Sequence, residues 1–284
     1  MKLRESRAVG FAVLAAIYVL AWGLGFWLFR SLPFDFWLNL LLADAAATAL
    51  VFGFSAALDN ASVYDPYWSV FPVAAMLTAC AGRALTPLNI IHLAAISLWG
   101  LRLTANWAYT FHGLGSQDWR YTMLKEKTGP WYPAVNFLGI HLAPTLIVYG
   151  CTLPALLSLR WGLAGDALSL SLALLSFGAV ALQGTADWQL HAFRRTHRGQ
   201  LIRTGLWKHS RHPNYLGEIL MWWGVGLSAA AAVRGRLWLL SGAAANTLLF
   251  LFISIPMADQ RQSRKEGYAA YRDSTRMLLP LRRR

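Results

Sequence analysis

Residues Lys208–Gly224 read KHSRHPNYLGEILMWWG, and within a few positions this stretch changes from a cluster of cations to an apolar, tryptophan-rich segment. A segment with the composition of a membrane helix therefore follows directly on a basic loop. Pro213 lies where a helix tolerates proline best, in its first turn. Asn214 and Glu218 are one turn apart and share a face. We therefore ask what these polar residues bind at the start of an apolar helix.

The composition around this stretch is that of a membrane protein. The chain has 284 residues, of which 56% are hydrophobic and 14% charged, and its mean hydropathy is +0.40. Soluble domains carry about a quarter charged residues. Long apolar runs recur along the whole length, which predicts an all-α, polytopic integral membrane helix bundle. The first run, Ala8–Phe29, lacks a small-residue cleavage site, so we interpret it as a span and not as a signal peptide.

The spacing of the apolar runs predicts seven or eight transmembrane helices. The candidate spans are Ala8–Phe29, Phe36–Leu58, Pro66–Ala81, Leu88–Trp107, Ala134–Leu159, Ala167–Leu190, Pro213–Val233 and Leu237–Met257. With a cytoplasmic N-terminus, 21 of the 26 Lys and Arg residues fall in segments on the cytoplasmic side. This pattern predicts that both termini are cytoplasmic, and the Ala-, Leu- and Arg-rich composition favours a bacterial inner membrane.

The net charge of +13 is explained by topology and by contact with membrane lipid. No recognition fold accompanies the charge, so a nucleic acid is not an expected partner. The two cysteines, Cys80 and Cys151, lie in apolar runs and offer no zinc spacing. Four histidines surround the basic loop, but the neighbouring cations would repel a divalent ion, and we expect no bound metal.

One helical stripe precedes the basic loop. It consists of Gln183, Asp187, His191 and Arg194, whose spacings of 4, 4 and 3 place them on one face. A carboxylate accepts hydrogen bonds from sugar hydroxyls, and a guanidinium binds phosphate oxygens, so this stripe suits a ribose and a phosphate. The alternative is an intrahelical ion pair with an arginine that extends to the membrane surface.

The basic loop offers a second set of candidate ligands. These are Arg203, Lys208, His209, Arg211 and His212, which form a cationic collar suited to the phosphates of a dinucleotide. Beyond the collar, Asn214, Glu218 and Trp222 recur at one-turn intervals and suit a carboxamide or a ribose. The alternative is an Asn that caps the helix and a Glu that pairs with a loop Arg. No GxGxxG motif or P-loop is present, so a nucleotide would have to bind to the membrane-embedded scaffold itself.

These motifs resemble a known family. GLWKHSRHPNYLGEILMWWG, the preceding ADWQLHAFRR and the later YAAYRDSTRMLLP are similar to the membrane-bound steroid 5α-reductases, and more closely to the bacterial branch of that family, whose function is unassigned. NASVYDPYWS and GSQDWRYTMLK resemble that branch as well. The RHPNYLGE core is shared with a wider superfamily that includes sterol reductases and isoprenylcysteine carboxyl methyltransferases.

The resemblance implies a single membrane domain, 1–284, with a cytosol-facing cofactor pocket. Residues 1–133 would line the hydrophobic substrate cavity, and residues 134–284 would form the NADPH pocket. By the resemblance, Asp187 and Arg194 hold the adenosine end of NADPH, and Asn214 and Glu218 contact its nicotinamide half. The other implied cofactor contacts are Gln183, Arg203, His209, Arg211, His212 and Tyr215.

The implied reaction is NADPH-dependent reduction of an enone double bond in a hydrophobic substrate, a steroid or another lipid. The steroid enzymes polarise the substrate ketone with an early Glu and a later Tyr, and the early helices here carry Asp44, Asp59 and Asp65 instead. We expect the catalytic donors among Tyr64, Asp65, Arg102 and Tyr121. Asp118 and Arg120 form a possible orienting pair.

Two alternatives remain open. The first is a membrane methyltransferase of the isoprenylcysteine type, which would bind S-adenosylmethionine at the same RHPNY collar. The second is a membrane protein that binds lipid without catalysis. The long cationic run from Arg194 to His212 favours a phosphorylated dinucleotide over S-adenosylmethionine.

Overall fold

A computed structural model describes residues 3–280, and every regular element within them is helical apart from one isolated bridge between Ser210 and Arg276. Six segments of the described chain are long and apolar enough to cross a membrane. They are Arg7–Ser31, Phe36–Ala57, Pro87–Thr110, Trp119–Arg160, Ala167–Thr196 and Leu237–Gln262. The prediction of an all-α, polytopic membrane protein is confirmed.

The two remaining predicted spans form helices that are not among these six. Pro66–Ala81 contains α3 (Tyr67–Cys80), whose 14 residues fall short of the roughly 20 that a span needs. Pro213–Val233 contains α9 (Pro213–Ala232). The fifth predicted span lies in the continuous stretch Trp119–Arg160, which comprises α5 (Trp119–Thr128), η3 (Gly129–Trp131), α6 (Tyr132–Val135), the π-helix η4 (Asn136–Leu142) and α7 (Ala143–Arg160).

The chain divides into two compact units. Unit 1 comprises the residues up to Ala75 together with Gly100–Tyr149, and unit 2 comprises Met76–Trp99 and the residues from Gly150 onward. Consequently α3, α4 (Pro87–Thr110) and α7 contribute residues to both units. This grouping differs from the predicted division at residue 133, because a segment from the middle of the chain belongs with the C-terminal helices.

Unit 1 is built around α1 (Arg7–Ser31) and α2 (Phe36–Ala57), which pack against each other. Side-chain caps set where both helices begin, since Ser6 accepts from the amide of Val9 and Asp35 accepts from the amide of Leu38. The short helices η1 (Leu3–Glu5) and η2 (Ala61–Tyr64) complete the N-terminal part, and α2 also packs against η2 and η4. Polar side chains in this unit therefore lie between α2 and the short helices η2 and η4.

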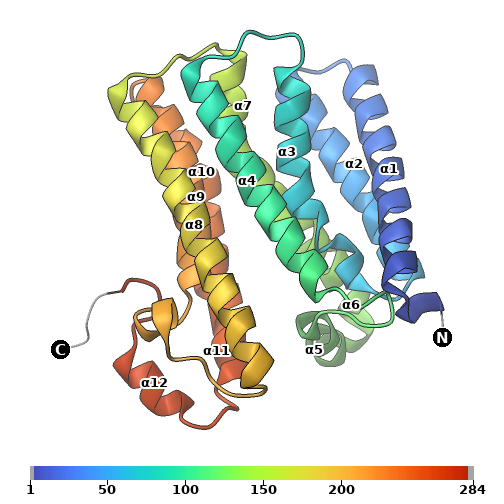
Figure 1. The fold of residues 1–284 in the computed structure, drawn as a ribbon. Coiled ribbons are helices and arrows are strands. Elements are labelled where there is room, and N and C mark those ends of the chain that lie inside the picture. Colours follow the sequence, from blue (N-terminus) through green and yellow to red (C-terminus); the bar gives the residue numbers. More distant parts are fainter. Residues whose placement is uncertain (1–2, 281–284) are drawn as a thin grey trace. The chain divides into compact units, whose positions relative to one another are not determined.

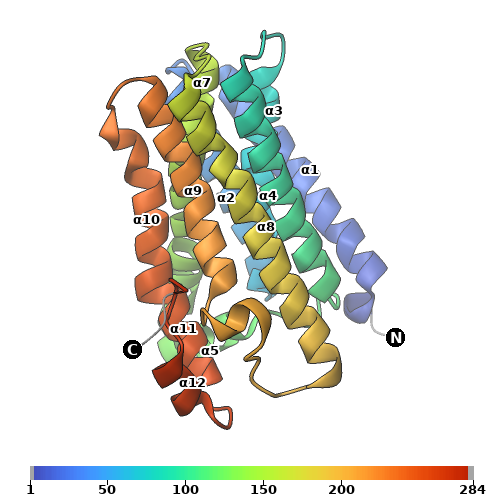
Figure 2. The same ribbon diagram turned by 60° about the vertical axis from the view of Figure 1, so that its left-hand side comes forward.

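Unit 2 is dominated by the contact between α8 (Ala167–Thr196) and α9, which lie side by side in both ribbon views (Figures 1 and 2). Two glycines of α9 allow this approach. A Cβ atom on Gly217 would lie 2.5 Å from Gln183 Cγ, and one on Gly224 would lie 2.4 Å from Ser176 Oγ. Small residues at a helix interface let backbones pack closely, so any larger residue at either position would push the helices apart.

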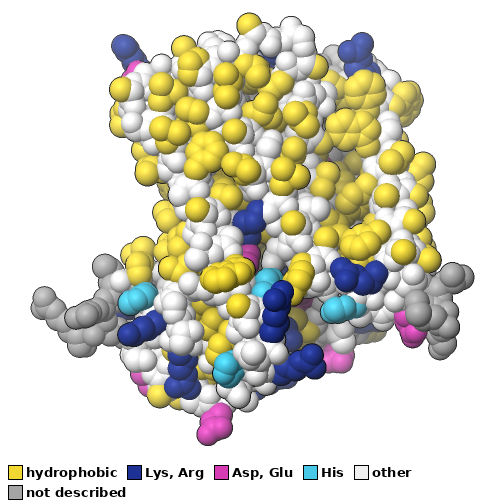
Figure 3. Space-filling view, in the orientation of Figure 1, with side chains coloured by type: hydrophobic (Ala, Val, Ile, Leu, Met, Phe, Trp, Pro, Cys, Tyr) yellow, Lys and Arg dark blue, Asp and Glu magenta, His cyan; other side chains and the backbone are white. Residues whose placement is uncertain are grey.

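The C-terminal part of unit 2 adds a second apolar segment and a polar end. Its elements are η5 (Gly205–Lys208), η6 (Leu237–Leu240), α10 (Ser241–Leu249), the π-helix η7 (Phe250–Ser254), α11 (Ile255–Gln262) and α12 (Tyr268–Ser274). Exposed apolar residues such as Leu175 and Phe252 suit contact with lipid. In the left half of Figure 3, Lys, Arg and His side chains gather toward the end where α11 and α12 lie (Figure 1).

Candidate functional site

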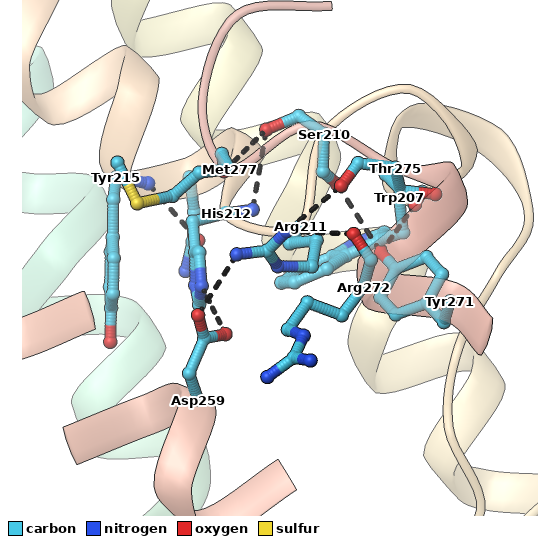
Figure 4. Close-up of polar contacts among 11 residues, drawn as sticks. Trp207, Ser210, Arg211, His212, Tyr215, Asp259, Tyr271, Arg272, Thr275 and Met277 are labelled. Atoms are coloured by element: carbon cyan, nitrogen blue, oxygen red, sulfur yellow. Dashed lines mark hydrogen bonds and ion pairs between the residues drawn. The ribbon is translucent and has the colours of Figure 1, made fainter. Parts of the chain in front are cut away.

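The entrance to α9 is fixed by one carboxylate that contacts an arginine and a histidine. Arg211 and His212 immediately precede the helix, and both contact Asp259 of α11, at 3.0 Å from Arg211 Nη2 and 2.9 Å from His212 Nε2 (Figure 4). Both side chains are buried. The sequence indicates these two residues but not their partner, since Asp259 lies 47 residues further along the chain.

The C-terminal segment holds the same loop through its backbone. The amide of Arg211 donates to the carbonyl of Arg276. The Arg211 guanidinium donates to the carbonyl of Thr275 (Figure 4). Tyr271 of α12 donates to the carbonyl of Trp207, and burial raises the pKa of its hydroxyl to about 12, so this donor keeps its proton. Arg211 and His212, predicted as phosphate ligands, thus form hydrogen bonds within the protein. They form part of the wall of the site.

A cavity of about 120 Å³ lies beside this network. Arg194 at the end of α8, Asn214 and Tyr215 at the start of α9, and Lys265 after α11 line it. The Tyr215 ring stacks on the His212 ring with centroids 5.3 Å apart and planes inclined by 5°. The structure therefore brings together five predicted cofactor residues at one cavity, namely Arg194, Arg211, His212, Asn214 and Tyr215.

The cavity has more basic residues in and near it than the sequence motifs indicate. Partial burial, together with the charges of Arg194 and Arg261, lowers the pKa of Lys265. Three cations from α8, α11 and the following loop therefore act on one another. A phosphate group is the natural ligand for such a group of cations, because its charge relieves their mutual repulsion. Lys265 and Arg261 were missed from the sequence because they lie in a tail whose charge is also explained by topology.

The stripe on α8 divides between two environments. Asp187 Oδ1 accepts a hydrogen bond from Asn214 Nδ2 at 3.2 Å, which joins α8 to α9 near the cavity. Gln183, one turn earlier, is fully buried where α8 packs against Gly217 and does not line the cavity. Of the predicted stripe, Arg194 thus lines the cavity, Asp187 contacts the cavity residue Asn214, and Gln183 supports the helix contact.

Glu218 is buried beneath the start of α9 and accepts hydrogen bonds from two indoles. Trp99 Nε1 lies 2.9 and 2.8 Å from the two carboxylate oxygens, and Trp222 Nε1 lies 2.9 Å from Oε1. The sequence predicts Trp222 as a neighbour of Glu218, and the structure adds Trp99 from α4. The carboxylate is held rigidly by these donors, since two rings fix its plane.

Five of the ten predicted cofactor residues do not line the cavity, namely Gln183, Asp187, Glu218, Arg203 and His209. Arg203 is exposed and donates to the carbonyl of Glu266 at 3.4 Å, and its guanidinium lies against Gly267, where φ is +72°. His209 is exposed on the same loop and does not line the cavity. The residues of the collar predicted from sequence therefore lie in two environments. Arg211 and His212 are buried, whereas Arg203 and His209 are exposed.

Unit 1 contains the predicted catalytic residues, which occupy two separate clusters. Tyr121 donates to Asp65 Oδ1 at 2.5 Å, and burial raises the pKa of Asp65 to about 6 despite this bond and the nearby Arg120. Tyr64, the neighbour of Asp65 in sequence, points elsewhere and shares a 2.8 Å hydrogen bond with Thr145. Arg102 is half-buried on α4.

A further pair in unit 1 was not predicted as catalytic. Tyr67 of α3 donates to Asp44 Oδ1 of α2 at 2.8 Å, and both residues are buried. Asp44 Oδ2 is buried and has no hydrogen-bond partner within the described protein. The sequence shows Asp44 within an apolar span, and only the fold reveals that a tyrosine 23 residues later lies beside it.

A family model described as "Protein of unknown function (DUF1295)" matches residues 51–275. The chain belongs to the DUF1295 family. It is 27% identical over 232 residues to an uncharacterized protein of Schizosaccharomyces pombe, a match that covers 71% of this chain and 67% of the relative. No solved structure matches the chain. The family region includes every residue that lines the basic cavity, whereas Asp44 precedes it.

Among the described residues, no group of three or more His, Cys, Asp and Glu side chains is placed to hold a metal ion. His212 instead contacts a carboxylate that also binds an arginine. The site therefore offers anion-binding cations and hydrogen-bonding side chains.

Proposed function

We propose that this DUF1295 protein is a membrane reductase that uses NADPH to reduce a carbon–carbon double bond conjugated to a carbonyl group in a lipid-soluble substrate. The resemblance of its RHPNYLGE region to the steroid 5α-reductases supports this class of reaction. The observation that carries the proposal is the basic cavity of unit 2, where Arg194, Arg261 and Lys265 act on one another.

The residues around the cavity fit part of a phosphorylated dinucleotide. A volume of about 120 Å³ is smaller than the roughly 300 to 1,000 Å³ of typical ligand pockets, so the cavity suits the phosphate-bearing part of the cofactor. Arg194 and Lys265 would bind phosphate oxygens, and the Asp187 carboxylate would accept from a ribose hydroxyl. S-adenosylmethionine carries no phosphate for these cations to bind.

Asn214 and Glu218 would hold the nicotinamide half. A primary carboxamide both donates and accepts hydrogen bonds, which an Asn and a carboxylate one turn apart can match. When bound, NADPH would supply the hydride. The task of the chain is to fix the ring and keep water from it, and the two indoles on Glu218 limit the movement of that carboxylate.

Within unit 1, the Asp44–Tyr67 pair is the best candidate to polarise the substrate carbonyl. In its protonated form, Asp44 Oδ2–H would donate to the carbonyl while Tyr67 fixes the other oxygen. Donors directed at an oxygen on which negative charge develops are a large source of catalysis. Asp65, whose pKa is raised to about 6, is the candidate that supplies the proton to the α-carbon.

The test is nucleotide binding to the detergent-purified protein. We expect NADPH, followed by its fluorescence, to bind the native protein, and Arg194→Ala or Lys265→Ala to weaken binding by about tenfold each, the effect of losing a charge-assisted hydrogen bond. Arg264→Ala removes an exposed arginine next to Lys265 that does not line the cavity, and it should change affinity by less than twofold.

Two results would contradict the proposal. Equal losses in Arg194→Ala and Arg264→Ala would indicate attraction by general charge. Mass spectrometry of the co-purified ligands is the independent test, since S-adenosylmethionine would indicate a methyltransferase and lipid alone would indicate a binding protein.

A further inference from the structure

Unit 1 contains a second cavity, of about 350 Å³, formed by the end of α2, η2 and the stretch from α5 to η4. All of its lining residues belong to unit 1, so it is distinct from the basic cavity of unit 2. Ser55 and Asp44 both lie on α2, eleven residues apart, which corresponds to about 16 Å along the helix. The Asp44–Tyr67 pair therefore does not account for this cavity.

Two buried polar side chains line the cavity without a partner in the described protein. Ser55 is 1% exposed and Asn136 is 6% exposed, and neither Ser55 Oγ nor Asn136 Oδ1 has a hydrogen bond there. Buried polar atoms are nearly always paired, because leaving one unpaired costs free energy. Asn136 also opens the π-helix η4, and such helices are frequent at functional sites. These two atoms therefore indicate that a ligand completes the site.

The walls indicate the character of that ligand. Phe52, Pro130, Tyr132 and Pro133 provide apolar surface around the two polar atoms. Lys125 and Asp59 also line the cavity and form an exposed ion pair at 2.7 Å, so they neutralise each other. A neutral ligand with an apolar body thus fits better than an ion.

The unpaired atoms define the polar group of the ligand. The carbonyl oxygen of Asn136 only accepts, so the ligand must donate to it, and the Ser55 hydroxyl both donates and accepts. A hydroxyl group can donate to Asn136 and can accept from Ser55, so it matches both side chains. We infer that this cavity is a second small-molecule site, specific for an uncharged lipid alcohol whose hydroxyl binds Asn136 and Ser55 and whose apolar body lies against Phe52 and Tyr132.

The experiment compares two photoreactive probes on the full-length protein in detergent. One is a diazirine-bearing dodecanol, and the other is its methyl ether, which keeps the chain and the oxygen but cannot donate a hydrogen bond. Labelling of peptides 52–61 and 125–136 is measured relative to the lipid-facing peptide that contains Phe252. We expect the alcohol to label the cavity peptides about five- to tenfold more strongly than the ether, the effect of one hydrogen bond.

Variants identify the groups that cause this preference. Asn136→Leu and Ser55→Ala should each reduce the alcohol-to-ether ratio toward one. Asn246→Leu is the matched control, because Asn246 is another buried asparagine with an unpaired side-chain atom, lies in unit 2 and lines neither cavity. Thermal unfolding identifies a variant that fails to fold. If Asn136→Leu fails to fold, Ser55→Ala alone provides the test, since it removes only one oxygen atom.

The inference is overturned if alcohol and ether label the native cavity equally, if the preference survives in Asn136→Leu or Ser55→Ala, or if the label lies on other peptides. None of these measurements depends on NADPH, so they separate this site from the proposed reductase activity.

Discussion

The two units contain their buried polar groups in different chemical forms. In unit 1 these groups are mainly hydroxyls and amides around single carboxyl groups, as in Tyr67 with Asp44 and Tyr64 with Thr145. In unit 2 they include the buried Arg211, which binds Asp259 together with His212, and the cavity beside this network is also lined by the cations Arg194 and Lys265. The first arrangement suits an uncharged ligand, and the second suits an anion.

The two units also differ in the contacts that hold these polar groups in place. The hydroxyl pairs of unit 1 lie between helices and need no other support. The charged set of unit 2 depends on α12 and the segment that follows it, which bind the basic loop through backbone carbonyls. The comparison therefore predicts that losing a charge in unit 2 costs stability, whereas losing a hydroxyl in unit 1 affects chemistry more than folding.

Asp259→Ala should give the largest effect. It leaves Arg211 and His212 buried without their shared carboxylate, and removing one partner of a buried ion pair typically costs about 3 kcal/mol or more. We expect a decrease in the free energy of unfolding of that size, together with release of the C-terminal segment, measured by thermal unfolding and by limited proteolysis after α11.

The control is Asp273→Ala, which removes an exposed carboxylate 3.6 Å from Arg272. Exposed pairs contribute about 0 to 1 kcal/mol, so this variant should unfold almost as the native protein does. If both variants lost equal stability, Asp259 would not be the residue that holds the loop.

Tyr67→Phe tests the uncharged side of the comparison. It removes the hydrogen bond that fixes Asp44 and, under the proposed function, should lower the rate of NADPH-dependent enone reduction by about tenfold, the effect of losing one hydrogen bond that positions the donor. NADPH affinity should change less than twofold, because Tyr67 belongs to unit 1.

Tyr18→Phe is the matched variant, since the Tyr18 hydroxyl donates to the carbonyl of Val63 at 2.8 Å and touches neither Asp44 nor the cavity of unit 1. Each variant loses one side-chain hydrogen bond, so each should lose about 1 kcal/mol of stability. Equal reduction rates in the two variants would remove Asp44 and Tyr67 from the proposed chemistry.

The sequence predicted the helical membrane class because apolar runs report directly on burial in lipid. It also predicted five residues of the basic cavity, since helical spacing places Arg194, Asn214 and their neighbours on shared faces. These signals are local. They depend on residues within a few turns of one another.

The remaining part of the site depends on contacts between distant segments. Asp259 lies 48 residues beyond Arg211, and Trp99 precedes Glu218 by 119 residues. Periodicity within one helix contains no information about such pairs. The second cavity was missed for the same reason, since Ser55 and Asn136 are ordinary polar residues until the fold places both on one cavity without partners.

A change of pH should give the smallest effect and test the one titrating carboxyl group of unit 1 that the proposal uses. Burial raises the pKa of Asp65 from 3.8 to about 6. Between these two values the unfolded chain is ionised at this position while the folded protein keeps its proton. The contribution of Asp65 to stability should therefore be fully present below pH 3.8 and should decrease by about 1 to 3 kcal/mol as the pH rises from 3.8 through 6.

Asp65→Asn removes this proton and should flatten the dependence, so that the variant gains stability relative to the native protein between pH 4 and pH 7. Melting temperatures of both proteins across that range, at constant ionic strength and with Asp273→Asn as the exposed control, measure the difference. Parallel curves for the native protein and Asp65→Asn would show that Asp65 titrates normally. The acid of the proposed reaction would then have to be sought elsewhere in unit 1.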